Sequence, residues 1–206
     1  MAGIVLVMMS ASPVLSQTPL KLAVLGDSLT AGYGLPATAA FPVRLEKALR
    51  EKGLKVDVLN AGVSGDTASG GRDRLDWSIP EGTEAVIVEL GANDALRGLD
   101  PAVTRAALED IIRKLQARKI AVMLAGMYAP RNYGTDYAAK FDPIYPELAK
   151  AFDVPLYPFF LDGVAAEAKL SQPDGLHPTA EGVDVIVARI LPAVEQFLSK
   201  VSAARR

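Results

Sequence analysis

The sequence contains no cysteine, one histidine and one tryptophan, and aromatic residues make up only 6% of its 206 residues. Without cysteine the chain can form no disulfide bond, no thiolate zinc site and no lipid-modified cysteine anchor. A single histidine leaves carboxylates as the main metal ligands, so metal catalysis is a poor fit and no metal or cofactor is expected. Proton transfer through an imidazole near neutral pH would depend on His177 alone.

The chain also lacks an excess of charge of either sign. It has 22 Lys and Arg residues against 24 Asp and Glu residues, which gives a formal net charge of −2. The basic residues are spread through helical stretches, so we expect no nucleic-acid partner. Half of the residues are apolar and 22% are charged, a composition that supplies a sizeable core and excludes a disordered chain.

The N-terminal segment has a short hydrophobic run at residues 4–9, which is too short to span a bilayer. Residues 1–19 contain no Lys, Arg, Asp or Glu, and small residues follow the run, with a candidate cleavage site after Ser16. This pattern predicts a signal peptide, with a plain N-terminal extension as the alternative because the only positive charge before the run is the α-amine. We therefore expect a periplasmic or secreted protein, otherwise a cytoplasmic one, without stable membrane insertion.

After Pro19, short apolar stretches alternate with amphipathic ones. The pattern predicts strands at 21–25, 55–59, 84–90, 120–125 and 154–157, the last at a sheet edge because it contains a proline. Helices are predicted at 41–52, 101–119, 135–151 (bent or split by Pro143 and Pro146) and 179–199 (interrupted or kinked near Pro192). Alternating strands and helices form βαβ units, so residues 20–206 are predicted to be a single three-layer α/β/α domain with a flavodoxin-like, parallel, five-stranded sheet.

Polar segments follow the first four predicted strands. They are residues 26–28, 60–71, 91–94 and 126–134, and they collect Gly, Asp, Ser and Asn. In a parallel α/β sheet, ligands bind beyond the carboxyl ends of the strands. The loop that carries His177 precedes the final helix and can close over the same edge, so a functional site is predicted there.

The residue types at this edge match the needs of serine-based acyl transfer. Ser28 follows a strand on a tight turn, and its hydroxyl becomes nucleophilic only when a base such as His177 removes its proton. Asp174, three residues before the histidine, can orient the imidazole. Backbone N–H groups of Ser28 and Gly65 and the side-chain amide of Asn93 can bind a developing oxyanion. Each residue alone could be an ordinary cap or turn residue, so the inference rests on their joint presence.

The segments that contain these residues resemble the blocks of the SGNH, or GDSL, hydrolase superfamily, whose letters stand for Ser, Gly, Asn and His. The resemblance covers nearly the whole chain after Pro19 and is greatest toward the bacterial arylesterase, acyl-CoA thioesterase and lysophospholipase subgroup. Ala92, where many members carry glycine, is a small departure. The matching segments are 26–34, 60–67, 89–98, 132–134, 145–149 and 174–178.

The resemblance implies a carboxylic ester hydrolase that works through an acyl-enzyme on Ser28, with His177 as the base and Asp174 as its orienting acid. It also implies that Ser28, Gly65 and Asn93 form the oxyanion hole. Expected substrates are small-molecule esters or thioesters, namely aryl or short- to medium-chain acyl esters, acyl thioesters and lysophospholipids. Oligomeric state is left open, with a monomer favoured.

Segments 92–98 and 127–137 are expected to form the substrate-binding walls, with ordinary loop packing as the alternative. Their candidate substrate-binding residues are Leu96, Tyr133 and Tyr137. Asp27 is expected to hold the turn rather than to take part in proton transfer.

Other classes fit less well. The Gly-x-Ser-x-Gly elbow of α/β-hydrolases is absent around Ser28. Residues 32–37 match a dinucleotide-binding pattern, but they do not begin at a strand end and Pro36 interrupts them. Carbohydrate O-deacetylases and O-acyltransferases of the same superfamily stay open as alternatives, as does a flavodoxin-like binding module without enzymatic activity.

Overall fold

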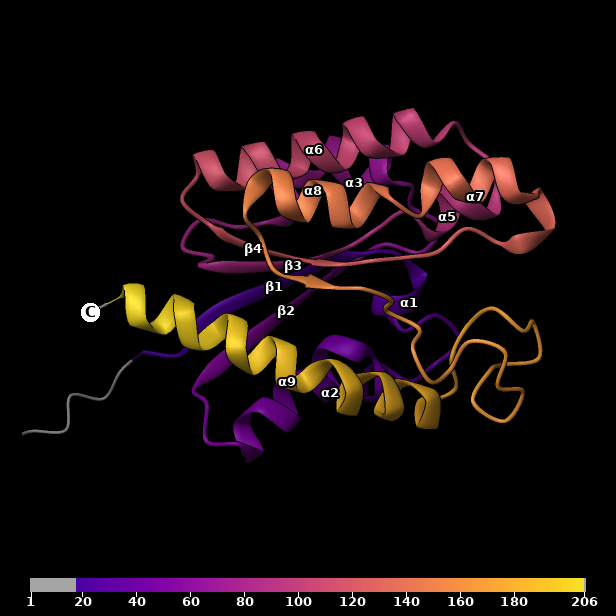
Figure 1. Ribbon diagram of the computed structural model, residues 1–206. Helices are drawn as coiled ribbons and strands as arrows, with labels where there is room; N and C mark the ends of the chain where they lie inside the picture. The colour runs from indigo at the N-terminus through magenta and orange to yellow at the C-terminus, as the bar shows by residue number, and fades with distance from the viewer. Residues whose placement is uncertain (1–17, 206) are drawn as a thin grey trace, which may run out of the picture.

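The computed structural model describes residues 18–205 (Figure 1). The signal peptide predicted for residues 1–19 therefore lies almost entirely outside the described residues. The described chain forms one parallel five-stranded sheet in the order β2-β1-β3-β4-β5. The strands are β1 (Leu20–Gly26), β2 (Val56–Gly62), β3 (Ala85–Glu89), β4 (Ala121–Ala125) and β5 (Leu156–Tyr157).

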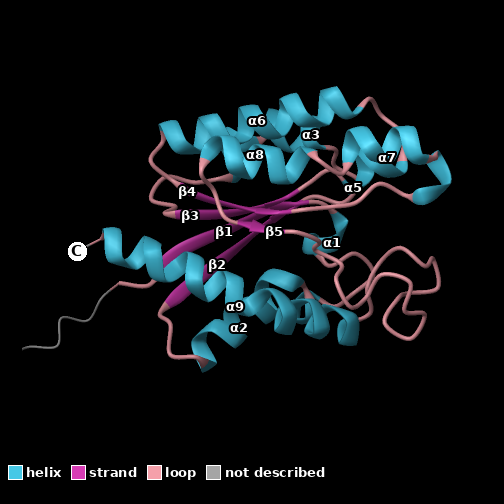
Figure 2. Cartoon of the chain, in the orientation of Figure 1, coloured by secondary structure: helices cyan, strands magenta, loops and turns pink. Residues whose placement is uncertain are grey.

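Helices cover both faces of this sheet, which confirms the predicted three-layer α/β/α fold (Figures 1 and 2). One layer contains α3 (Ala68–Asp73), α5 (Ala92–Leu96), α6 (Pro101–Ala117), α7 (Thr135–Phe141) and α8 (Ile144–Phe152). The opposite layer contains α2 (Phe41–Glu51) and α9 (Ala180–Ala204). The remaining short elements are α1 (Ser28–Ala31), α4 (Leu75–Ser78) and the 3₁₀ turns η1 (Ala37–Ala39) and η2 (Arg131–Tyr133).

The core lies on both faces of β1, β3 and β4, the strands that are buried along most of their length. Every residue of β3 is buried, as is every residue of β1 except Lys21. A parallel sheet covered on both faces needs such nearly continuous apolar strands. Glu89, at the end of β3, is the exception: it is a fully buried carboxyl in an otherwise apolar strand.

Two proline predictions have different outcomes. The helix predicted at 135–151 is split into α7 and α8, and Pro143 occupies the N-cap of α8, where its missing N–H costs no helical hydrogen bond. By contrast, Pro192 does not end α9, which continues to Ala204. The apolar face of α9 is buried on both sides of this proline, and such tertiary packing outweighs one lost backbone hydrogen bond.

Several short helices were missed because four to six residues are too few to show a helical period. Two of them carry candidate site residues, since Ser28 begins α1 and Asn93 lies in α5. Within residues 18–205, the structure has no helix that combines the length and apolar character needed to cross a membrane.

Candidate active site

Ser28 is the first residue of α1, directly beyond the end of β1. The side chain of Asp27 caps this helix by accepting a 3.0 Å hydrogen bond from the backbone N–H of Leu29. Gly26 makes the tight turn possible, because a Cβ there would lie 2.3 Å from Thr30 Oγ1. The turn leaves Ser28 with only 8% of its surface exposed, at the carboxyl edge of the sheet.

His177 links Ser28 to Asp174 by two side-chain contacts. Its Nε2 lies 2.9 Å from Ser28 Oγ, and its Nδ1 lies 2.6 Å from Asp174 Oδ2. Asp174 Oδ1 accepts hydrogen bonds from the backbone N–H groups of His177 and Leu176. These bonds, together with that from the imidazole, lower the pKa of Asp174 to about 2. The ionised carboxylate favours the tautomer with its proton on Nδ1, which leaves Nε2 free to accept the Ser28 proton.

Gln172 fastens the histidine loop to the segment that follows the nucleophile. Its backbone N–H donates to the carbonyl of His177 (2.7 Å), and its side-chain amide donates to the carbonyls of Pro178 (2.9 Å) and Tyr33 (2.8 Å). The Tyr33 ring also packs on the imidazole, with 4.5 Å between ring centroids. Gly34 adopts φ +73°, and a Cβ at this position would lie 2.3 Å from Gln172 Oε1. No sequence motif indicates Gln172, whose role is to hold the histidine loop in place.

Asn93 lies in the short helix after β3 and reaches back to the nucleophile turn. Its Nδ2 donates a 3.0 Å hydrogen bond to Asp27 Oδ2. The next residue, Asp94, is fully buried and accepts hydrogen bonds from the backbone of Ala68 (2.8 Å) and the hydroxyl of Thr104 (2.9 Å). Asp94 thus ties α5 to α3 and α6, which fixes the position of Asn93.

Gly65 lies in the loop after β2, next to the end of β1. The backbone N–H of Val63 donates to the carbonyl of Gly26 (3.1 Å), which holds this loop against the strand that leads to Ser28. Gly65 has φ +86°, a conformation that favours glycine, and its carbonyl accepts a 2.8 Å hydrogen bond from Arg97 Nη2. The structure therefore brings the loops of all four SGNH letters to the same edge.

Two carboxyls and one guanidinium are buried beneath the turn. Burial raises the pKa of Asp27 to about 6, against the opposing effect of its hydrogen bonds, and raises the pKa of Glu89 well above its usual value. Arg74 is also buried and donates to the carbonyls of Gly26 (2.9 Å) and Ala61 (2.7 Å). It thereby joins the ends of β1 and β2, a role that its sequence neighbours do not indicate.

The three residues predicted to bind substrate lie together, in short helical segments that follow β3 (Leu96, at the end of α5) and β4 (Tyr133 in η2 and Tyr137 in α7). Tyr133 donates its hydroxyl hydrogen to the carbonyl of Leu96 (2.8 Å), and its ring lies 5.4 Å from that of Tyr137. Leu96 and Tyr133 are exposed, whereas Tyr137 is half-buried and donates to the carbonyl of Leu99 (2.9 Å). These contacts build a partly apolar wall from the segments that follow β3 and β4.

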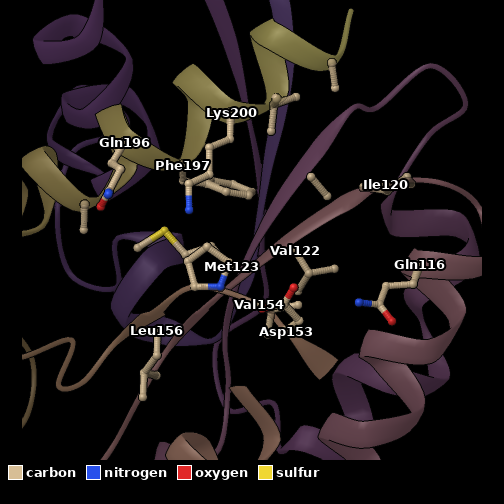
Figure 3. Close-up of a pocket in the computed structure, with 15 residues that line it drawn as sticks. Gln116, Ile120, Val122, Met123, Asp153, Val154, Leu156, Gln196, Phe197 and Lys200 are labelled. Atoms are coloured by element: carbon tan, nitrogen blue, oxygen red, sulfur yellow. The ribbon is translucent and has the colours of Figure 1, made fainter. Parts of the chain in front are cut away.

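A separate cavity of about 660 Å³ lies away from these residues (Figure 3). It is bounded by the starts of β4 and β5 and by the C-terminal part of α9, whereas Ser28 follows the carboxyl end of β1. Met123, Leu156 and Phe197 contribute apolar walls, with Lys200 also among the lining residues. None of its lining residues is one of the site residues predicted from the sequence, so the cavity is not their substrate pocket.

The part of the chain that the structure describes contains no group of three or more His, Asp or Glu residues placed to hold a metal ion. The arrangement at the carboxyl edge instead provides a hydroxyl, an imidazole and a carboxylate in hydrogen-bonded sequence.

Comparison with known proteins agrees with this chemistry. The model of the GDSL-like lipase/acylhydrolase family matches residues 24–185. An arylesterase of Vibrio mimicus is 42% identical over 167 residues, which cover 81% of this chain and 84% of the relative. Thioesterase 1/protease 1/lysophospholipase L1 of Escherichia coli K12 is also 42% identical, over 78% of this chain and 76% of the relative.

Among solved structures, the esterase AlinE4 of the SGNH-hydrolase family superposes with a TM-score of 0.75. It is 46% identical, and the match covers 87% of this chain and 97% of that one. The chain thus belongs to the GDSL-like lipase/acylhydrolase family, and it is a serine ester hydrolase of the SGNH type.

Proposed function

We propose that this chain cleaves aryl esters and short- to medium-chain acyl esters through an acyl-enzyme on Ser28. The observation that carries the proposal is the continuous contact from Ser28 Oγ through the imidazole of His177 to Asp174. Such a chain of hydrogen bonds lets the serine hydroxyl give up its proton as its oxygen attacks the ester carbonyl, whereas an isolated serine is a poor nucleophile at neutral pH.

In the first half-reaction, Ser28 Oγ bonds to the carbonyl carbon of the ester and its proton passes to His177 Nε2. The carbonyl π electrons move to oxygen, and the oxyanion accepts hydrogen bonds from the Ser28 and Gly65 backbone N–H groups and from Asn93 Nδ2. Collapse of the intermediate breaks the bond to the leaving oxygen, which takes the proton from the imidazolium. Asp174 stabilises that imidazolium without itself accepting a proton.

In the second half-reaction, water replaces the alcohol or phenol. His177 Nε2 removes a proton from the water as its oxygen bonds to the acyl carbon. The second tetrahedral intermediate then expels Ser28 Oγ, which regains a proton from the imidazolium, and the carboxylic acid leaves. The same three oxyanion donors serve both half-reactions.

The substrate class is proposed from the wall that contains Leu96 and Tyr133. Its apolar side chains suit an aryl group or a short acyl chain better than a polar sugar, which favours esterase activity over carbohydrate deacetylation. Relatives named arylesterase and thioesterase/lysophospholipase support this range and extend the candidate substrates to acyl thioesters and lysophospholipids.

A hydrolysis panel tests this proposal. It would contain p-nitrophenyl esters of increasing acyl length, aryl acetates, acyl-CoAs, a lysophospholipid and an acetylated sugar, assayed with the wild type, Ser28→Ala and His177→Ala. We expect aryl and short acyl esters to be cleaved fastest and both variants to lose nearly all activity. Preferential cleavage of the acetylated sugar would instead support a deacetylase, and transfer of the acyl group to an added sugar would support an acyltransferase.

Active-site labelling separates an enzyme from a binding module with the same fold. A fluorophosphonate should label the wild type on Ser28 and should not label Ser28→Ala. A fully active His177→Ala would contradict the mechanism, because the chain has no second histidine to replace it.

We also propose that the protein is exported to the periplasm or secreted. The support is the composition of residues 1–19, which combine an apolar run with small residues and lack charged side chains. N-terminal sequencing of protein from the periplasm and medium should find a mature end near Gln17. An intact Met1 on a protein confined to the cytoplasm would contradict export.

A further inference from the structure

The orientation of the Asn93 carboxamide depends on a single hydrogen bond. Its Nδ2 carries two hydrogens, of which one is donated to Asp27 Oδ2 at 3.0 Å and the other is available to a ligand. Within residues 18–205, the Asn93 side chain makes no other hydrogen bond. An amide is nearly symmetric in shape, so only an acceptor such as a carboxylate forces the NH₂ group, rather than the oxygen, to face it.

The same carboxylate also holds the nucleophile turn. Asp27 Oδ1 accepts the backbone N–H of Leu29, which fixes the first turn of α1 and with it the backbone N–H of Ser28. One buried side chain thus contacts two of the three elements that carry the proposed oxyanion donors. The third, the loop with Gly65, is held by the end of β1 and does not involve this carboxylate.

We propose that Asp27 is a positioning residue of the oxyanion hole, which orients the Asn93 amide so that one N–H points to the substrate oxygen. This inference rests on the proposed function, since it concerns the donors that stabilise the tetrahedral intermediate. Asp27 does not contact substrate, and its effect on the reaction passes through Asn93.

Helix capping alone does not explain a charged residue at this position. Ser, Thr or Asn caps a helix about as well as Asp, and none of them requires a charge to be buried. Asp27 is fully buried, and burying an ionised carboxylate is costly unless hydrogen bonds compensate. The ionised form, however, is the form in which both oxygens are acceptors, as the contacts to Leu29 and Asn93 require.

Other charged groups surround this carboxylate. The imidazole of His177 and the carboxyl of Asp66 act on its ionisation. Glu89 Oε2 accepts a 3.4 Å hydrogen bond from the backbone N–H of Asp27, and the Arg74 guanidinium lies next to the turn through its bond to the Gly26 carbonyl. Burial raises the pKa of Asp27 to about 6, whereas the hydrogen bonds from Leu29 and Asn93 oppose this rise. The Asn93 contact therefore favours the ionised form on which it depends.

Two substitutions separate capping from positioning. Asp27→Ser keeps a hydroxyl that can cap α1 but is too short to reach Asn93. Asp27→Asn keeps an oxygen for the Leu29 N–H but presents an NH₂ group to Asn93, whose amide must then turn its oxygen inward. For both variants we expect kcat for p-nitrophenyl acetate to fall roughly 10²-fold, the effect of losing one oxyanion donor, with KM changed by less than about threefold.

Thr30→Val provides a matched control in the same turn. It removes the 3.3 Å hydrogen bond from Thr30 Oγ1 to the Asp27 carbonyl and leaves the contact to Asn93 in place. We expect its kcat to stay within about threefold of the wild type. If Thr30→Val lost as much activity as Asp27→Asn, disturbance of the turn would explain both losses and positioning through Asn93 would be wrong.

A double-mutant cycle supplies the decisive comparison. Asn93→Ala alone should lower kcat by roughly 10²–10³-fold, and adding Asp27→Asn to it should lower kcat by less than about threefold more. Losses that multiply would overturn the proposal, because Asp27 would then act independently of Asn93. Ser28→Ala, measured in parallel, separates failure of the proposed function from failure of the role proposed for Asp27. Full activity of Ser28→Ala would refute the proposed function. Losses that multiply, together with an inactive Ser28→Ala, would refute only the role of Asp27.

A measurement on the wild type covers the case in which the Asp27 variants fail to fold. The side-chain amide resonances of Asn93 should shift with the same pH midpoint as the carboxyl carbon of Asp27. If the Asn93 amide showed no change at that midpoint, its orientation would not depend on Asp27 and the proposal would fail.

Discussion

Asp174→Asn tests the link between the orienting carboxylate and the base more sharply than removal of His177. Asparagine keeps an oxygen where Asp174 Oδ1 accepts the backbone N–H groups of Leu176 and His177, so the loop should hold its shape. Its NH₂ group, however, replaces Oδ2, which lies 2.6 Å from His177 Nδ1. Two donors cannot face each other, so Nδ1 must become the acceptor and the ring proton moves to Nε2.

That tautomer places an N–H against Ser28 Oγ, where the wild type has an acceptor at 2.9 Å. The base is then unable to take the serine proton, and loss of the correct tautomer in serine hydrolases costs about 10⁴ in kcat. We expect a loss of this order for Asp174→Asn with p-nitrophenyl acetate at pH 7.5, and unchanged thermal unfolding within about 2 °C. A kcat within tenfold of the wild type would refute the tautomer argument, because His177 would then accept the Ser28 proton without the Asp174 carboxylate.

Three further predictions concern the surroundings of the site. Gly34→Ala should lower both activity and melting temperature, since φ is +73° and the new Cβ would lie 2.3 Å from Gln172 Oε1; unchanged kinetics would show that Gln172 does not hold the histidine loop. Glu89→Gln should keep kcat at pH 7 within about threefold, because burial raises the pKa of Glu89 well above its usual value and so disfavours its charged form; a hundredfold loss of kcat would show that the reaction needs the Glu89 charge. The folded-state pKa of Asp27 is raised from 3.8 to about 6, so its ionisation weakens the fold progressively as pH rises through that window. The melting temperature of Asp27→Asn relative to the wild type should therefore rise between pH 4 and pH 7, and differential scanning fluorimetry would contradict this if the difference fell.

Ser28 and His177 are 149 positions apart, yet their meeting at one sheet edge is predictable from the sequence. Parallel strands bring all their carboxyl ends to the same edge of the sheet, so the polar segments that follow the strands must all lie at that edge. The alternation of apolar strands with helices suffices to predict this shared edge, and the motifs then identify the site residues that lie there.

The residues beneath and beside the site were not predictable in the same way. Arg74 stands in a polar stretch that looks like a solvated surface, and its burial results from carbonyl groups that only the folded strands bring near. Gln172 holds the histidine loop through a contact that spans 139 positions and has no local pattern. The orientation of Asn93 toward Asp27 likewise depends on where α1 and α5 lie in the fold, and these helices are too short to show periodicity in the sequence.

The placement of the nucleophile at the end of β1 has a consequence for how this enzyme could be altered. β1 lies between β2 and β3, so Ser28, Gly65 and Asn93 follow three adjacent strands whose separation is fixed by backbone hydrogen bonds. Hydrogen bonds between the peptide groups of these strands therefore set the distances among the reacting groups. The part of the substrate wall that contains Tyr133 instead follows β4, one strand farther out. Segment 127–137 could be exchanged to redirect substrate choice while the spacing among the three inner strands, and with it the chemistry, is left as it is.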